Sequence, residues 1–303
     1  MRVAITGSNG LIGSALTRSL LTDGHQVVRL VRNSPAAPGD GSESAHWDPL
    51  AGHVQPGALD GVDAVVHLAG AGIGDKRWTA TYKREIRSSR VRGTATIARA
   101  CAESEDPPRV LVSASATGHY GDTGARTVDE TGPAGDDFLA SVCVDWEAAA
   151  HPARRAGIRV VHPRTGLVVS TRGGAFGRLF PLFRLGIGGR LGSGDQYWPI
   201  VSLTDHIAAL RFVLASDALC GPVNFTAPEP PTNREVTRAM SHVLGRPAPA
   251  PVPAFALRVA LGEFAASITC SARVVPAALL RTGFVFRHPT VEEALDAVLR
   301  TSD

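Results

Sequence analysis

The sequence predicts an α/β protein with a doubly wound parallel sheet and a smaller, mainly helical C-terminal region. Short apolar strands alternate with helical patterns through the first half of the chain, as is typical of βαβ units. The run at residues 64–68 is almost continuously apolar and therefore suits a sheet that helices cover on both faces. The strands are expected at residues 3–5, 27–31, 64–68, 110–112 and 159–162.

The first strand leads into a turn with three glycines at the spacing G-x-x-G-x-x-G, and an amphipathic helix follows at once. We expect Gly7 to permit the tight turn, Gly10 to let a pyrophosphate approach bare backbone, and Gly13 to bring the helix close to the strand. The free N–H groups at the start of the helix would face the phosphates. This pattern predicts a Rossmann-type dinucleotide site, with further contacts expected from Thr6, Ser8, Leu11 and Ile12.

The end of the second strand indicates which dinucleotide binds. NAD-binding proteins of this type place an acidic residue there to bind the ribose 2′-OH, whereas this chain reads Arg32-Asn33-Ser34. Arg32 is placed to meet a 2′-phosphate through its planar guanidinium, with Ser34 as a neutral donor. NADP(H) is therefore favoured over NAD(H). The alternative is that Arg32 only solvates the end of a strand.

A change in composition and pattern along the chain predicts two regions. Residues 1–165 are predicted to form the dinucleotide-binding domain, with a return of the chain around 200–215, and residues 166–303 to form the C-terminal cap or substrate region. Glycines crowd the segment after Gly166, a helix opens at Thr232 and ends at Gly245, and a proline-rich run covers residues 247–253. The last helix is expected to start at Thr290 with a capping-box pattern.

Composition excludes several other classes of protein. A hydrophobic content of 44%, a charged content of 19% and a net charge of +3 describe an ordinary soluble globular chain. No Lys/Arg block or aromatic platform predicts nucleic-acid binding, and no apolar run approaches the length of a membrane span. The four cysteines lack C-x-x-C and zinc-ligand spacing, so we expect no metal site and a reduced, cytoplasmic setting. The first strand begins two residues after Met1, so no signal peptide is expected.

Motifs along the whole chain resemble the extended short-chain dehydrogenase/reductase group, whose members are NAD-dependent epimerase/dehydratase-like. Within it the chain is similar to a subfamily often labelled epimerase family protein. The motifs are His67–Ile73, Asp75–Trp78, Ser88–Arg90, Ser113–Asp122, Asp145–Ala149, Pro163–Gly166, Gly245–Pro247, Pro251–Pro253 and Gly283–Arg287. The resemblance implies cofactor contacts from Leu68, Ala69, Gly70, Ser113 and Pro163, and substrate contacts from Arg90 and Arg164.

One departure lies in the C-terminal half. The subfamily usually has an aromatic-Ile-His run where this chain reads Ile200-Val201-Ser202. If the missing histidine normally meets substrate, this protein would act on a different molecule from its relatives. Asp205 follows, either as a functional residue or as a helix N-cap.

A second departure concerns the chemistry. Members of the wider group use Tyr-x-x-x-Lys for proton exchange, but Cys143 and Glu147 occupy those positions here. A carboxylate beside a thiol raises the thiol pKa, so we expect no activated thiolate. Cys143 is then either a direct proton donor or a small apolar residue facing the cofactor. Ser115 would bind the substrate oxygen, as the family's serine does.

Because the usual catalytic tyrosine is absent, the roles of several other residues stay open. Tyr120 is the nearest phenol in sequence that could replace it, or else it packs in a turn. Arg90 could bind an anionic substrate or pair with Glu147. His67 lies inside an apolar run, which favours a core histidine.

These observations give two functional hypotheses. The first is an NADP(H)-dependent oxidoreductase or isomerase that acts on a small polar substrate by hydride transfer. The second is a catalytically weak or inactive NADP(H)-binding sensor. The sequence leaves open the substrate, the choice between reduction, epimerisation and dehydration, and whether the chain forms a homodimer.

Overall fold

The computed structural model describes residues 1–32, 39–249 and 251–300, and the predicted cofactor contact Ser34 lies outside them. The α/β prediction is confirmed. The main sheet has the order β12-β9-β6-β5-β1-β2-β3-β4, and β7 also pairs with β9. Its strands are β1 (Arg2–Thr6), β2 (Gln26–Val31), β3 (Glu43–Asp48), β4 (His53–Val54), β5 (Ala64–His67), β6 (Val110–Ser113), β7 (Ser115–Ala116), β9 (Arg159–Thr165) and β12 (Gly221–Phe225).

The sheet changes direction of growth at its first strand. From β1 the chain adds β2 and β3 on one side and then crosses back to add β5, β6, β9 and β12 on the other. The pairings between these strands are parallel, whereas β4 is antiparallel to β3. In open α/β sheets, ligands bind at the carboxyl ends of the strands where the order reverses. The expected place is therefore the edge formed by the ends of β1 and β5.

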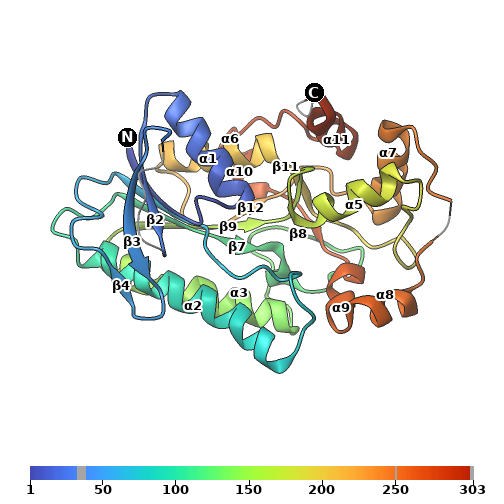
Figure 1. Ribbon diagram of the computed structural model, residues 1–303, viewed down its shortest axis with the longest axis horizontal. Helices are drawn as coiled ribbons and strands as arrows, with labels where there is room; N and C mark the ends of the chain where they lie inside the picture. Colours follow the sequence, from blue (N-terminus) through green and yellow to red (C-terminus); the bar gives the residue numbers. More distant parts are fainter. Residues whose placement is uncertain (33–38, 250, 301–303) are drawn as a thin grey trace.

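Helices cover both faces of this sheet (Figure 1). Val3 and Ile5 pack with α1 (Leu11–Thr22), α6 (Leu203–Ala215) and α10 (Ala277–Arg281). Ala4, between them, faces the opposite core with α2 (Ala80–Ala102) and α4 (His151–Arg155). The helix α3 (Phe138–Ala148) lies beside α2 on that face. This alternation explains why the strands read as apolar throughout.

The C-terminal region is mainly helical, as predicted. It contains α5 (Gly174–Arg184), α7 (Asn233–Leu244), α8 (Ala254–Leu261), α9 (Phe264–Thr269) and α11 (Val291–Arg300), and α5, α7, α8 and α9 lie at the right of Figure 1. Phe176, Phe180, Met240 and Leu295 share a core that is separate from those of the main sheet. A small parallel pair, β10 (Leu167–Val169) with β11 (Ile200–Ser202), lies within this region, and a second, β8 (Thr127–Val128) with β13 (Arg273–Val274), joins it to the rest.

The return of the chain differs in detail from the expectation. Residues 200–202 pair with β10 outside the main sheet, while α6 does pack on it through Leu210 and Val213. The strand that returns to the sheet is β12, beside β9, and sequence analysis did not identify it. The division at residue 165 stays a prediction.

Asp205 is not the N-cap of α6. The side chain of Ser202 caps that helix by accepting from the Asp205 backbone N–H. The Asp205 carboxylate is buried and accepts from the backbone N–H groups of Arg287 and His288, each at 2.9 Å. It therefore fastens the last segment of the chain onto α6.

Candidate functional site

The glycine-rich turn has the geometry that its spacing predicts. Gly7 adopts φ +66°, which side chains disfavour. A Cβ at Gly13 would lie 2.2 Å from the carbonyl oxygen of Gly7, so the helix could not approach the turn with any other residue there. Gly10 has an ordinary φ of −75° and precedes the first residue of α1 without a capping side chain. The first N–H groups of the helix are therefore not capped by a side chain, and no Cβ stands in front of them at Gly10.

This turn fits a dinucleotide pyrophosphate. A helix N-terminus that no side chain caps offers N–H donors and a positive dipole end to an anion. Ser8 is buried, and its hydroxyl has no hydrogen-bond partner among the described residues. Arg32 lies exposed at the end of β2, at the same edge of the sheet because β1 and β2 run parallel. A missed neighbour is Arg29, which donates to Asn9 Oδ1 of the turn at 3.4 Å and pairs with Asp40.

The end of β1 is joined to the loop after β5. Thr6 Oγ1 accepts from the N–H groups of Leu68 and Ala69 at 3.1 and 3.2 Å. It also lies 2.7 Å from His67 Nδ1. His67 is fully buried, and burial lowers its pKa to about 3. The histidine is therefore a neutral core residue, as expected. The hydrogen bonds of the Thr6 hydroxyl go to other residues of the protein.

Four of the predicted site residues form one buried network. Ser115 Oγ donates to Glu147 Oε1 at 2.7 Å. Arg164 holds the same carboxylate with two bonds, from Nε to Oε1 and from Nη2 to Oε2, both 2.9 Å. Its Nη1 donates to the Tyr120 hydroxyl at 3.0 Å, and Tyr120 donates onward to Asn224 Oδ1 at 2.7 Å. The network thus runs from the end of β6 across α3 and β9 to β12.

Electrostatics fix the protonation states in this network. Burial acts to raise the pKa of Glu147, but the hydrogen bonds and charge of Arg164 outweigh it and bring the pKa below its ordinary value. The carboxylate is therefore ionised at neutral pH. Burial raises the pKa of Tyr120 despite the nearby Arg164 charge. Neither residue offers a proton readily.

Cys143 is a buried, neutral thiol. It is 3% exposed, and its Sγ lies 3.7 Å from the carbonyl oxygen of Ala116. Burial, followed by the charge of Glu147, raises its pKa to about 12. The direction agrees with the sequence prediction, but burial is the larger cause.

Arg90 does not pair with Glu147, so that expectation is wrong. Arg164 already occupies both carboxylate oxygens. Arg90 Nη1 donates to the carbonyl oxygens of Ala71 and Ile86 at 2.9 and 3.1 Å, and its guanidinium lies 5.0 Å from the centre of the Trp146 ring. Its charge acts to lower the pKa of Cys143, against the larger effects of burial and Glu147.

The remaining predicted contacts lie at the same sheet edge. Gly70 lies in the loop after β5. It is close to Arg90, because a Cβ added at Gly70 would lie 3.5 Å from Arg90 Cγ. Ser113 ends β6, and its carbonyl oxygen lies 3.3 Å from His162 Nδ1. Pro163 is buried in β9 and pairs with Val223. The structure therefore brings the described residues of the prediction to one region, while their roles stay predictions.

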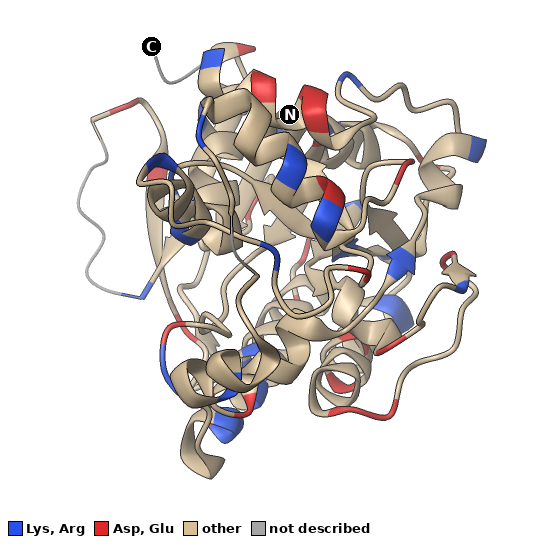
Figure 2. Ribbon diagram, turned by 90° about the vertical axis from the view of Figure 1, so that its right-hand side faces the viewer, with Lys and Arg blue, Asp and Glu red and all other residues tan. Residues whose placement is uncertain are grey.

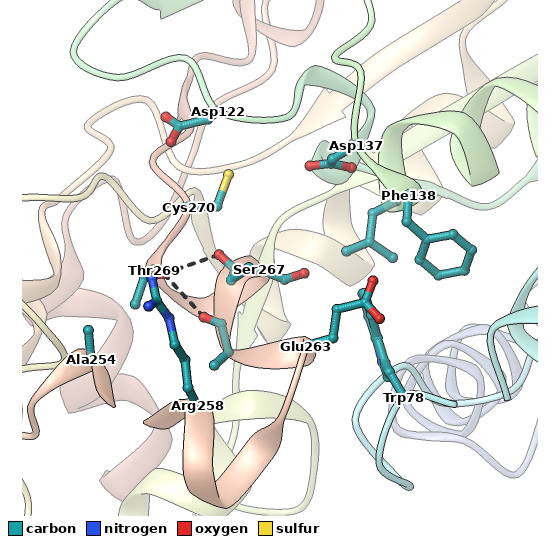
Figure 3. Close-up of a pocket in the computed structure, with 13 residues that line it drawn as sticks. Trp78, Asp122, Asp137, Phe138, Ala254, Arg258, Glu263, Ser267, Thr269 and Cys270 are labelled. Atoms are coloured by element: carbon teal, nitrogen blue, oxygen red, sulfur yellow. Dashed lines mark hydrogen bonds between the residues drawn. The ribbon is translucent and has the colours of Figure 1, made fainter. Parts of the chain in front are cut away.

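A cavity of about 370 Å³ opens beside this region, between α3 and the two short helices α8 and α9 (Figure 3). Trp78, Phe138 and Leu139 form its apolar side, and Leu139 lies one helical turn before Cys143. Arg258 and Glu263 line it from the C-terminal region. Sequence analysis missed these two residues because they lie in short helices without a recognisable motif.

Other kinds of site find no support in the described part of the chain. Its His, Cys, Asp and Glu residues form no group of three that could hold a metal ion. No helix within the described ranges is long and apolar enough to cross a membrane. Basic and acidic positions are interspersed in Figure 2.

Comparison with known proteins identifies the family. The sequence model of the NAD dependent epimerase/dehydratase family matches residues 3–224, and that of a domain of unknown function, DUF1731, matches residues 252–298. The chain therefore belongs to the NAD dependent epimerase/dehydratase family, and the resemblance stated above is confirmed.

Individual relatives cover almost the whole chain. An epimerase family protein of Mycobacterium bovis is 48% identical over 97% of this chain and 96% of its own length. The crystal structure of human epimerase family protein SDR39U1 with NADPH is 33% identical, covers 99% of both chains and has a TM-score of 0.90. The UDP-glucose 4-epimerase of Thermus thermophilus, in complex with NAD, is 21% identical with a TM-score of 0.77, which shows the fold alone.

Proposed function

We propose that this protein is an NADP(H)-dependent oxidoreductase or isomerase that acts on a small polar substrate. The observation that carries the proposal is the uncapped, side-chain-free start of α1, which fits a dinucleotide pyrophosphate. Arg32 at the end of β2, without an acidic residue there, supports NADP(H) over NAD(H). The similar human structure was determined with NADPH.

When bound, the nicotinamide would supply or accept a hydride. The protein would hold the pyrophosphate on the turn at Gly10 and the 2′-phosphate at Arg32. Ser115 would position the substrate oxygen, and the Glu147–Arg164 pair would orient Ser115 through the 2.7 Å bond to its hydroxyl. Because the Ser115 proton is directed at Glu147, the hydroxyl oxygen can only accept, so it would take a hydrogen bond from a hydroxyl group of the substrate.

The proton in such a reaction would come from water or from the substrate. Burial raises the pKa of Cys143 to about 12, Glu147 is ionised, and the Tyr120 hydroxyl donates its hydrogen bond to Asn224. We propose that Arg90, whose guanidinium lies over the Trp146 ring of α3, stabilises negative charge on the substrate instead. No hydrogen bond joins its Nε or Nη2 to another residue of the described ranges, so both can donate to a ligand.

The buried thiol at the usual tyrosine position also favours a second candidate, an NADP(H)-binding sensor without turnover. An enzyme would consume NADPH with at least one compound in a panel of carbonyls and enones, whereas a sensor would bind NADPH and leave it unchanged. The absorbance of NADPH over time separates the two.

Calorimetric titration tests the nucleotide assignment. Gly10→Val should abolish NADPH binding with the fold kept, because the added Cβ would meet only the Gly7 carbonyl oxygen, at 3.2 Å, while the side chain fills the phosphate position. Arg32→Ala should weaken NADPH roughly 10- to 100-fold more than NADH, as expected for loss of a charge-assisted bond.

Arg18→Ala, at an exposed arginine further along α1, is the matched control and should change neither affinity. Unchanged affinity in Gly10→Val would remove the nucleotide site. Equal losses of NADPH and NADH in Arg32→Ala would show that Arg32 does not read the 2′-phosphate.

A further inference from the structure

A second cavity, of about 430 Å³, lies in the C-terminal region between α7 and the proline-rich segment that follows it. Three arginines line it: Arg190 before α7, and Arg234 and Arg238 on α7. No carboxylate lines it, in contrast to the cavity beside α3, which includes Asp122, Asp137 and Glu263. Its lining is therefore basic, although the surface as a whole carries both signs of charge (Figure 2).

The arginines come together because α7 presents one polar face. Arg234, Thr237, Arg238 and Ser241 recur at the spacing i, i+3, i+4, i+7, whereas Val236, Ala239 and Met240 face the core. The hydroxyls of Thr237 and Ser241 donate to the backbone at 2.8 and 2.6 Å. The guanidinium groups therefore remain as the donors that a ligand could use.

The charge of this cavity is only partly balanced. Arg234 pairs with Asp195 at 2.5 Å and, like Arg190, donates to the carbonyl oxygen of Ser193. Arg238 has no hydrogen bond or ion pair with any residue in the part of the chain that the structure describes. One carboxylate near three guanidinium groups leaves an excess of positive charge facing a concave surface.

The opposite wall is held in place by the backbone. The N–H of Val252 donates to the carbonyl oxygen of Arg190 at 2.8 Å, and the N–H of Gly192 donates to Val252 at 2.9 Å. These bonds fasten the proline-rich segment to the segment that carries Arg190. Pro249 and Pro251 line the side of the cavity opposite the three arginines and make that side apolar.

We propose that this cavity binds the phosphate group of a small-molecule phosphate ester. Planar guanidinium forks match phosphate oxygens and form paired, charge-assisted bonds with them. The apolar proline wall would take the body of the ester. The site shares no residue with the glycine-rich turn, the Ser115 network or the cavity beside α3, so it stands apart from the proposed function.

Titration of inorganic pyrophosphate into the full chain saturated with NADPH tests this site, because the nucleotide then blocks the glycine-rich turn. We expect binding of one pyrophosphate. Arg190→Gln and Arg238→Gln should each weaken it about 10-fold or more, whereas Arg18→Gln, an equal charge change on α1, should leave it unchanged. Arg238 has no partner to lose among the described residues, so its variant should melt at the parent temperature.

Two results would overturn the proposal. One is the absence of pyrophosphate binding to the NADPH-saturated chain. The other is an equal loss of affinity in Arg18→Gln, which would mean general attraction of anions to a basic protein. Gly10→Val separates this site from the nucleotide site, because it should retain pyrophosphate binding at the arginine cavity even where NADPH no longer binds.

Discussion

Cys143 and Glu147 stand one helical turn apart on α3, but they do not act on each other as an isolated pair. Arg164 takes up both oxygens of the Glu147 carboxylate, and the thiol is shut away from solvent. The pKa of about 12 therefore reflects burial first and the carboxylate second. Sequence reasoning could anticipate the direction of the shift from the i, i+4 spacing. It could not anticipate Arg164 at Glu147, because β9 reaches α3 only through the tertiary fold.

Cys143→Ala should retain most of any turnover that the compound panel reveals, because burial raises the pKa of the thiol to about 12 and makes it a poor proton donor at neutral pH. Ser115→Ala should lose about 10- to 1000-fold in kcat/KM, as for removal of one positioned polar group. Steady-state rates of the two variants decide the matter, with NADPH affinity measured in each as the control. A dead Cys143→Ala that still binds NADPH would make the thiol the catalytic acid.

At the scale of elements, local signals predicted well wherever the cause is local. The helix predicted to open at Thr232 and end at Gly245 does so: Thr232 and Glu235 form a capping box, and Gly245 ends α7 with φ +59°. Thr290 and Glu293 bond each other at the start of the last helix, again as expected. A turn or a cap depends on a few neighbouring residues, so its sequence pattern is sufficient evidence.

Strands at the margins of the sheet were missed for an equally physical reason. β12 begins Gly221-Pro222 and contains the buried Asn224, so it lacks an apolar run. Proline is tolerated because β12 is an edge strand with a partner on one side only. β3 alternates buried and partly exposed residues over Glu43–Asp48, and it was not among the expected strands.

Asp205→Ala should lower the free energy of unfolding by about 3 kcal/mol, because two partly buried backbone N–H groups would lose a charged acceptor. Asp217→Ala is the matched control, since that carboxylate is fully exposed, and its effect should stay within about 0.5 kcal/mol. Urea unfolding followed by circular dichroism measures both. Equal effects in the two variants would show that the last segment does not depend on Asp205 for its attachment.

At the scale of the whole molecule, the candidate site is assembled from parts that the sequence keeps far apart. Tyr120 meets Asn224 across 104 residues, and the Glu130 carboxylate accepts from the N–H of Ala278 across 148. Motifs identified the strand ends that converge on the proposed nucleotide site, because parallel strands have their carboxyl ends at one edge of the sheet. The bonds among Ser115, Glu147 and Arg164 depend on side-chain packing after the sheet has formed, and no spacing in the chain predicts them.

The same packing keeps His67, His162 and His206 buried and neutral, which makes the stability of the whole fold sensitive to acid. Burial lowers the pKa of His67 and His206 to about 3 and that of His162 to about 4, from an ordinary value of 6.5. Below pH 6.5 the unfolded chain binds protons at these sites and the folded chain does not. The stabilisation is therefore present above pH 6.5 and is lost as the pH falls toward the folded-state values.

Each histidine should cost about 2 kcal/mol of unfolding free energy between pH 7 and pH 5. His67→Gln removes one such group, so the difference in stability between the two pH values should shrink by about that amount, whatever the variant loses overall. His242→Gln, at an exposed position on α7, is the control. Urea unfolding of the parent chain and the two variants at both pH values gives the three differences needed. If His67→Gln shows the same drop between pH 7 and pH 5 as the parent chain, His67 is protonated in the folded protein and its burial is not what the structure indicates.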